Sequence, residues 1–120
     1  MNQYEMGRRA EHLAALYLRA RGYRIWKTNW RWGRKELDLV TLYREQLVVV
    51  EVKAMDGNTV NDPLYVVDAR KQRNIIAATE AFIRIHDCRR PTRFDVVSVS
   101  WAGGTLGIEH IENAFLPVVE

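Results

Sequence analysis

Two neighbouring runs of sequence decide the fold, ELDLVTL at residues 36–42 and LVVVEVK at residues 47–53, with only YREQ between them. Both runs are rich in β-branched and apolar residues, and the second is apolar enough to be a central strand. A short polar separator between two such runs is typical of a hairpin turn. The two runs therefore predict an antiparallel β-hairpin in the middle of a sheet.

Helical and strand-like patterns continue on both sides of this hairpin. Apolar residues recur at helical spacing over residues 3–21, and Gly22 follows as a helix-ending glycine. Asp68 has the side chain of an N-cap and precedes a second amphipathic run that ends near residue 85. Further strands are expected at residues 23–29, 94–100 and 106–111, and loop signals stand at residues 56–58 and 61–63.

The resulting order is αβββαββ, which predicts an α/β or α+β fold with a central mixed sheet flanked by helices. No repeat, low-complexity segment or Pro/Gly-rich linker divides the 120 residues, so we expect a single domain over residues 1–120. The N-terminus lacks the pattern of a signal peptide, and no apolar run approaches the ~20 residues that span a bilayer. We therefore expect a soluble, cytoplasmic protein without a membrane partner.

Positive charge is concentrated in one segment, although the formal net charge is only +3. No acidic residue occurs between His12 and Lys35, where seven basic residues are interleaved with Tyr23 and three tryptophans. Cations neutralise phosphates and aromatic rings stack on bases, so this segment is a candidate nucleic-acid-binding surface, with Arg31, Arg34 and Lys35 as contacts. The alternative is a solvated helix end and edge strand whose tryptophans belong partly to the core, and composition alone favours it slightly.

Four charged residues of the hairpin form the candidate site. Because side chains alternate along a strand, Glu51 and Lys53 share one face about 6.5–7 Å apart, and Glu36 and Asp38 also share a face. A turn with an even number of residues would place Asp38 opposite Glu51 and Glu36 opposite Lys53. A turn of odd length would break this register, since a slip of one residue reverses the faces.

A divalent cation would explain two carboxylates in opposed positions. Such residues have Cβ atoms about 4.5–5.5 Å apart, so Asp38 and Glu51 would repel each other unless a cation lay between them. Mg²⁺ and Mn²⁺ bind carboxylate oxygens together with water and phosphate oxygens. Lys53 would orient or deprotonate an attacking water, or stabilise charge on phosphorus. The alternative is an ordinary ion pair between Lys53 and Glu36 with Glu51 in solvent, although Glu51 ends a run typical of a buried strand.

Other charged residues lie outside the hairpin. Glu11 stands at the margin of the apolar stripe of the first helix, beside small residues, where a carboxylate could reach the metal; an exposed helix glutamate fits the spacing equally well. Lys71 and Arg73, in the first turns of the second helix, could contact phosphates, although an exposed basic helix face is the commoner explanation. Arg93 and Asp95 are expected to form a structural pair.

Seven spaced motifs run through nearly the whole chain: GRRAE (7–11), AALYL (14–18), GY (22–23), ELDLV (36–40), VEVK (50–53), RFDVV (93–97) and NAF (113–115). Together they resemble the YraN family, also called UPF0102. That family is similar to the PD-(D/E)XK, or restriction-endonuclease-like, superfamily, and within it to archaeal Holliday-junction resolvases. The resemblance implies a restriction-endonuclease-like fold, with Asp38, Glu51 and Lys53 as its motif and Glu11 as the helix glutamate of the resolvases.

From residues and resemblance together we expect an endonuclease dependent on Mg²⁺ or Mn²⁺ that hydrolyses phosphodiesters of DNA, rather than RNA, in branched or structured substrates. Asp38, Glu51 and Glu11 would hold the metal and Lys53 would assist the chemistry, with Glu36 as a partner of Lys53 or an extra ligand. Activity on junctions would imply a homodimer, because resolvases cut symmetrically. The alternative function is a nuclease-fold module that binds nucleic acid or a protein partner and cuts nothing.

Overall fold

The computed structural model describes residues 2–55 and 67–117. Its elements follow the predicted order αβββαββ, so the α+β class is confirmed. The loop signals at residues 56–58 and 61–63 lie outside the described residues. The elements are α1 (Gln3–Ala20), β1 (Arg24–Trp32), β2 (Lys35–Tyr43), β3 (Gln46–Met55), α2 (Ala69–His86), β4 (Thr92–Ala102) and β5 (Thr105–Phe115).

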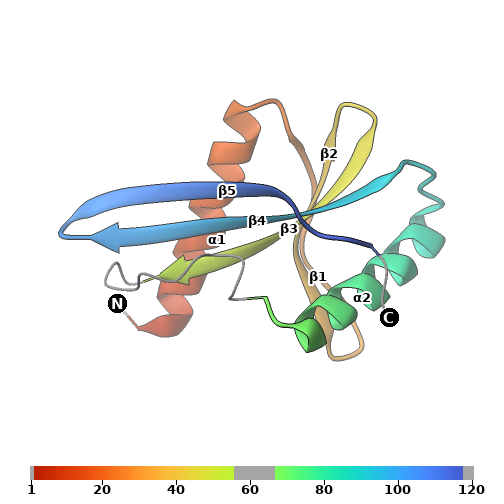
Figure 1. Cartoon of the computed structure of the whole chain (residues 1–120), viewed down its shortest axis with the longest axis horizontal. Helices are drawn as coiled ribbons and strands as arrows, with labels where there is room; N and C mark the ends of the chain where they lie inside the picture. Colours follow the sequence, from red (N-terminus) through yellow and green to blue (C-terminus); the bar gives the residue numbers. More distant parts are fainter. Residues whose placement is uncertain (1, 56–66, 118–120) are drawn as a thin grey trace.

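The five strands form one mixed sheet in the order β1-β2-β3-β4-β5. Neighbouring strands are antiparallel except β3 and β4, which are parallel and therefore need a crossover between them. The helix α2 lies in that connection, and the two helices cover opposite faces of the sheet (Figure 1). Within the described residues, neither helix combines the length and the hydropathy that crossing a membrane requires.

The helix α1 packs on the sheet through small side chains. Asn2 caps its N-terminus by accepting a hydrogen bond from the Glu5 backbone N–H at 2.8 Å. Ala10 and Ala14 are completely buried against β3 and β4, which lets the helix backbone approach the sheet closely. Gly22, with φ +92°, takes the left-handed conformation in which a helix commonly ends.

The helix α2 covers the other face and carries the larger apolar side chains. Asp68 is its N-cap, as predicted, and accepts a hydrogen bond from the Lys71 backbone N–H at 2.8 Å. Phe82 is fully buried, and the rings of Trp26 and Trp30 pack on it edge to face with centroids 5.0 and 5.1 Å away. These two partly buried tryptophans therefore pack on the core, which agrees with the alternative interpretation of the basic segment.

The hairpin of β2 and β3 has the even turn that the predicted register requires. Leu42 pairs with Leu47, and a two-residue turn at Arg44 and Glu45 joins the strands, with Arg44 at φ +53°. The backbone ladder continues as far as Leu39 and Val50. Asp38 and Glu51, the next pair in this register, are neighbouring carboxyls although the backbone ladder ends before them.

Beyond Leu39 the two strands of the hairpin part. Leu37 and Val40 pack on the α2 side of the sheet and Leu39 on the α1 side, so regular alternation fails at Asp38. The Asp38 carboxylate accepts the Val52 N–H at 2.9 Å, in place of a β2 backbone carbonyl. The prediction that Glu36 lies opposite Lys53 is therefore wrong, because the β2–β3 ladder ends before it reaches them.

Candidate metal centre

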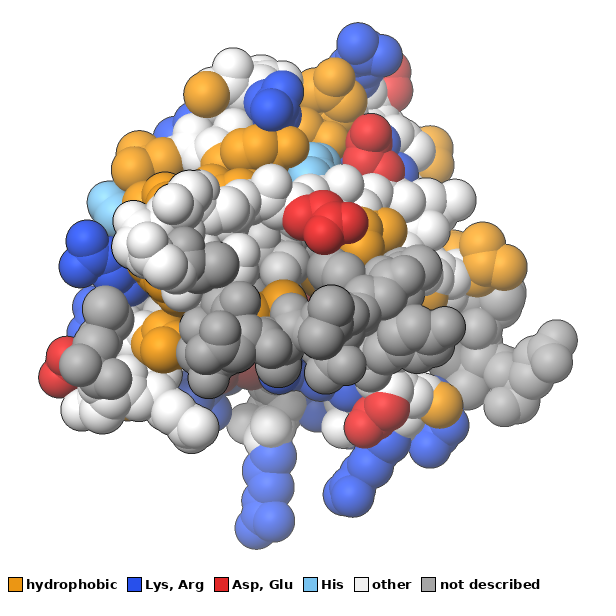
Figure 2. All heavy atoms as spheres, turned by 60° about the vertical axis from the view of Figure 1, so that its left-hand side comes forward, with side chains coloured by type: hydrophobic (Ala, Val, Ile, Leu, Met, Phe, Trp, Pro, Cys, Tyr) orange, Lys and Arg blue, Asp and Glu red, His pale blue; other side chains and the backbone are white. Residues whose placement is uncertain are grey.

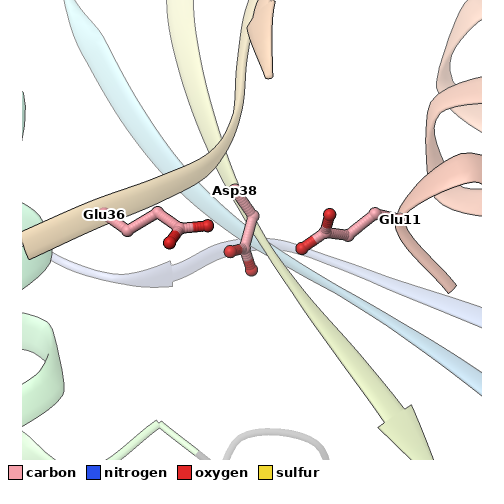
Figure 3. Close-up of side chains that lie close together, drawn as sticks. All are labelled: Glu11, Glu36 and Asp38. Atoms are coloured by element: carbon pink, nitrogen blue, oxygen red, sulfur yellow. The ribbon is translucent and has the colours of Figure 1, made fainter. Parts of the chain in front are cut away.

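Carboxylates from α1 and β2 converge at the point where the hairpin opens. Glu11, Glu36 and Asp38 each offer an oxygen within 4.8 Å of the others (Figure 3). Glu11 is thus half-buried and points toward the sheet, unlike an ordinary exposed helix glutamate. The small residues of α1 allow this approach, because they bring the helix close to the strands.

Asn29 of β1 holds two of these carboxylates together. Its Nδ2 donates to Glu11 Oε1 at 2.9 Å and to Glu36 Oε1 at 3.0 Å. Its backbone is in the left-handed region, with φ +48°, which asparagine tolerates better than most residues. The sequence predicted no role for Asn29, although an asparagine inside a strand pattern is uncommon enough to be a signal.

Glu51 is the most deeply buried carboxylate of the site, with only 5% of its surface exposed. Its Oε1 forms an ion pair with Lys71 Nζ of α2 at 3.0 Å. Its Oε2 is buried and has no hydrogen-bond partner among the described residues. The alternative in which Glu51 faces solvent is therefore wrong, and half of its carboxylate is available to a ligand.

Burial and neighbouring carboxylates raise the pKa values of Glu11, Asp38 and Glu51. The pKa of Asp38 is well above its usual range, first because the group is buried and second because Glu51 is adjacent. Burial also raises the pKa of Glu51, although Lys71 opposes this shift. The pKa of Glu11 is raised by burial and by Asp38 and Glu36, against the hydrogen bond from Asn29.

The two lysines near Glu51 are placed differently. Lys53 shares the α2 face of β3 with Glu51 but is exposed, and it makes no hydrogen bond or ion pair within residues 2–55 and 67–117. Lys71 is also half-exposed, yet its ammonium reaches Glu51; burial lowers its pKa, but the charge and hydrogen bond of Glu51 outweigh this and raise it. The expected pair of Lys53 with Glu36 is replaced by one between Arg31 and Glu36 at 3.0 Å.

A cavity of about 400 Å³ opens over Glu36, Asp38 and Glu51, between β2 and the start of α2. Basic residues line its rim: Arg34, Lys35, Arg70 and Lys71. Arg73 is exposed and outside this lining, and the side chain of Arg31 is 69% exposed. Lys and Arg side chains also project from the lower edge of the face in Figure 2. The cavity thus joins an acidic floor to a basic rim.

Comparison of the sequence with known proteins identifies the family of the chain. The model of the family described as "Uncharacterised protein family UPF0102" matches residues 10–99. The chain belongs to the UPF0102 family. The matched range contains all the carboxylates described above and both lysines.

Similar UPF0102 proteins cover nearly the whole chain. One from Phocaeicola vulgatus is 41% identical over 115 residues, covering 96% of this chain and 95% of its own length. One from Porphyromonas gingivalis is 43% identical over 113 residues, covering 92% and 84%. One from Chlorobium chlorochromatii is 39% identical over 117 residues, covering 92% and 91%. Their names give the family and no activity, so function must come from the chemistry of the site.

Proposed function

We propose that this UPF0102 protein is a divalent-metal-dependent endonuclease that hydrolyses phosphodiester bonds of DNA. The observation that carries the proposal is the adjacent pair of the half-buried Asp38 and the buried Glu51, whose Oε2 has no hydrogen-bond partner among the described residues. A buried carboxylate oxygen without a donor is costly, so such a group is retained where a ligand satisfies it. The carboxylates in the floor of the cavity offer that ligand oxygen atoms, with the ammonium of Lys71 beside them.

The donor set fits a hard cation. Mg²⁺ and Mn²⁺ prefer carboxylate oxygens, and they keep waters and phosphate oxygens as their remaining ligands. Asp38 and Glu51 would hold the ion, Glu11 would assist directly or through a water, and Glu36 would be an extra ligand. When bound, the metal would polarise the phosphate and lower the pKa of a coordinated water. The pKa values of Asp38 and Glu51 are raised, as expected of buried carboxyls whose charged form a bound cation would stabilise.

The surrounding side chains have separate tasks. Asn29 keeps Glu11 and Glu36 oriented toward Asp38. Lys53, on the same strand face as Glu51, would orient or deprotonate the attacking water or stabilise charge on phosphorus. Its exposure leaves it free to turn toward a substrate that fills the cavity.

The basic rim supports a polyanionic substrate. Arg34 and Lys35 on one side and Arg70 and Lys71 on the other can neutralise phosphates on both sides of the acidic floor. DNA is preferred to RNA because of the resemblance to the resolvases, and the same resemblance suggests branched DNA and a homodimer. A chain that cuts junctions symmetrically would need a second copy of itself.

A cleavage assay tests the proposal. Supercoiled plasmid, linear duplex and a four-way junction are incubated with Mg²⁺, with Mn²⁺ or with a chelator, using the wild-type protein, Asp38→Asn and Lys53→Ala. Asp87→Asn is a matched control, because it removes one carboxylate charge at the far end of α2, where asparagine tolerates φ +49°. We expect metal-dependent cleavage that both site variants reduce at least about 100-fold and the control leaves unchanged.

Two outcomes would contradict the proposal. Cleavage that persists in Asp38→Asn would assign the activity to a contaminant or to another site. Tight DNA binding without cleavage under either metal, unchanged by both substitutions, would instead favour a binding module that cuts nothing.

A further inference from the structure

Lys71 is the one cation among the described residues that reaches the deepest carboxylate of the site. It stands in the first turn of α2, where Asp68 binds its backbone N–H, and its Nζ lies 3.0 Å from Glu51 Oε1. The side chain of Glu51 is 6% exposed and that of Lys71 is 53% exposed. A flexible, half-exposed cation is therefore bound to a fixed, buried anion.

The free oxygen of the same carboxylate defines where a metal would enter. Glu51 Oε2 has no hydrogen-bond partner within residues 2–55 and 67–117, and Asp38 is the adjacent carboxyl. A divalent ion held by this oxygen and Asp38 would lie only a few ångströms from the ammonium of Lys71. Two cations so close in a partly buried site repel each other strongly, so the one on the flexible side chain has to move.

The cavity above the carboxylates offers the displaced ammonium a place to bind. Lys71 lines the cavity above the acidic floor, together with Arg34, Lys35 and Arg70. A DNA phosphate bound over the metal would occupy this space, and lysine is well suited to bind phosphate as a mobile point charge.

We propose that Lys71 is the counter-ion that a divalent cation replaces, and that the released ammonium then binds a phosphate of the nucleic-acid substrate. The inference rests on the proposed function, since it takes the metal and the phosphate from it. Metal and DNA are then coupled through one side chain. A phosphate that draws Lys71 away from Glu51 favours metal binding, and by linkage the metal favours DNA binding by the same factor.

The first experiment measures metal affinity without DNA. Mn²⁺ is titrated into the wild-type protein, Lys71→Gln, Lys71→Arg and Arg70→Gln by calorimetry. Arg70→Gln is the matched control, because Arg70 lines the same cavity from the neighbouring position of α2 and has no carboxylate partner within the described residues. We expect Lys71→Gln to bind Mn²⁺ at least fivefold more tightly than the wild type, and both other variants to stay within twofold.

The second experiment measures DNA binding. Affinity for a short duplex is followed against salt, with and without Ca²⁺, at times before a gel detects any cleavage. Ca²⁺ should strengthen binding by the wild type, and Lys71→Gln should reduce this gain to the part that direct contact between metal and phosphate supplies. The salt dependence of Lys71→Gln should be smaller by about one unit only when Ca²⁺ is present, whereas Arg70→Gln should lose the same amount under both conditions.

The outcomes separate this inference from the proposed function. Unchanged or weaker Mn²⁺ binding by Lys71→Gln, with a wild type that binds Mn²⁺ and cleaves DNA, would overturn the role of Lys71 alone. A wild type that binds no Mn²⁺ would overturn both. Lys71→Arg keeps the charge, so a fivefold change in that variant as well would point to altered packing and would also overturn the inference.

Discussion

Two groups of charged residues on opposite faces of the sheet differ in how many hydrogen bonds they give to a buried carboxylate. On the α1 face, Asp95 of β4 is completely buried and both of its oxygens are occupied. Arg93 donates to them at 2.9 and 2.8 Å, His110 Nε2 lies at 2.7 Å and the Asn113 backbone N–H at 3.0 Å. Burial alone would raise the pKa of Asp95, but the hydrogen bonds from His110, Arg93 and Asn113 outweigh it and lower the pKa.

On the α2 face, Asp38 and Glu51 of the candidate metal centre have fewer such donors in the part of the chain that the structure describes. Among the described residues, Asp38 accepts one backbone N–H, and Glu51 binds Lys71 through one oxygen and has no hydrogen-bond donor at the other. Their pKa values are raised. The same small fold can satisfy a buried carboxylate fully, and the contrast supports the proposal that the incompletely satisfied carboxyls bind a ligand.

The largest expected difference between the two regions is in stability. Asp95→Asn should lower the free energy of unfolding by about 3–5 kcal/mol, because it removes the buried carboxylate that binds Arg93 and leaves that guanidinium only the exposed Glu112 as an ion-pair partner. Asp38→Asn should raise it by about 1 kcal/mol, because the amide removes the repulsion and can donate to Glu51. Denaturant unfolding in the presence of a chelator measures both. Equal destabilisation by the two substitutions would show that the regions do not differ.

Bound Mn²⁺ should raise the free energy of unfolding only where the carboxylates of the candidate metal centre are intact. At a Mn²⁺ concentration 100 times the dissociation constant, the wild type should gain about 2.7 kcal/mol of stability. His110→Gln, which removes one donor to Asp95, should start from a lower stability and gain the same amount. Asp38→Asn should gain almost nothing. A His110→Gln variant that Mn²⁺ does not stabilise, or an Asp38→Asn variant that it does, would contradict the proposed difference between the two regions.

The two regions should also respond oppositely to pH in metal-free protein. A carboxyl whose folded pKa is raised contributes stability below its unfolded value, near 3.9 for Asp38, and loses it as pH rises through the folded pKa. Asp95, whose pKa is lowered, contributes stability above that value and loses it as pH falls. Unfolding curves from pH 4 upward should therefore show the advantage of Asp38→Asn over the wild type growing with pH. Each unit of pKa shift corresponds to about 1.4 kcal/mol, and an advantage that is constant with pH would contradict this account.

The smallest effect should come from Asn29. Asn29→Gly keeps the left-handed backbone but removes the amide that orients Glu11 and Glu36. Metal affinity should fall about fivefold, the equivalent of roughly 1 kcal/mol, with little change in melting temperature. Calorimetric titration with Mn²⁺ checks it, and an unchanged affinity would remove Asn29 from the site.

Much of the fold followed from local patterns in the sequence. Helical periodicity and the caps Asp68 and Gly22 placed both helices within a residue or two of their observed ends. The even turn between β2 and β3 was enough to predict Asp38 beside Glu51, because register depends only on turn length. The pair of Arg93 and Asp95 was also predicted, since two residues two apart on a strand share a face.

The remaining features depend on tertiary geometry. The parting of the strands at Asp38 and the left-handed backbone at Asn29 have no periodic signature, so the expected pair of Glu36 and Lys53 was wrong. The contact of Lys71 with Glu51 depends on where the crossover sets α2 over the sheet. Spacing along the chain could not reveal it, and phosphate binding was the only role that the sequence suggested for Lys71.

Location of a bound metal tests the central claim most directly. Crystals soaked in Mn²⁺ should show an anomalous difference peak about 2.1–2.2 Å from carboxylate oxygens of Asp38 and Glu51, with Lys71 Nζ moved away from Glu51. A fully bound ion elsewhere on the protein, or no peak at this site with Lys71 still on Glu51, would contradict the account.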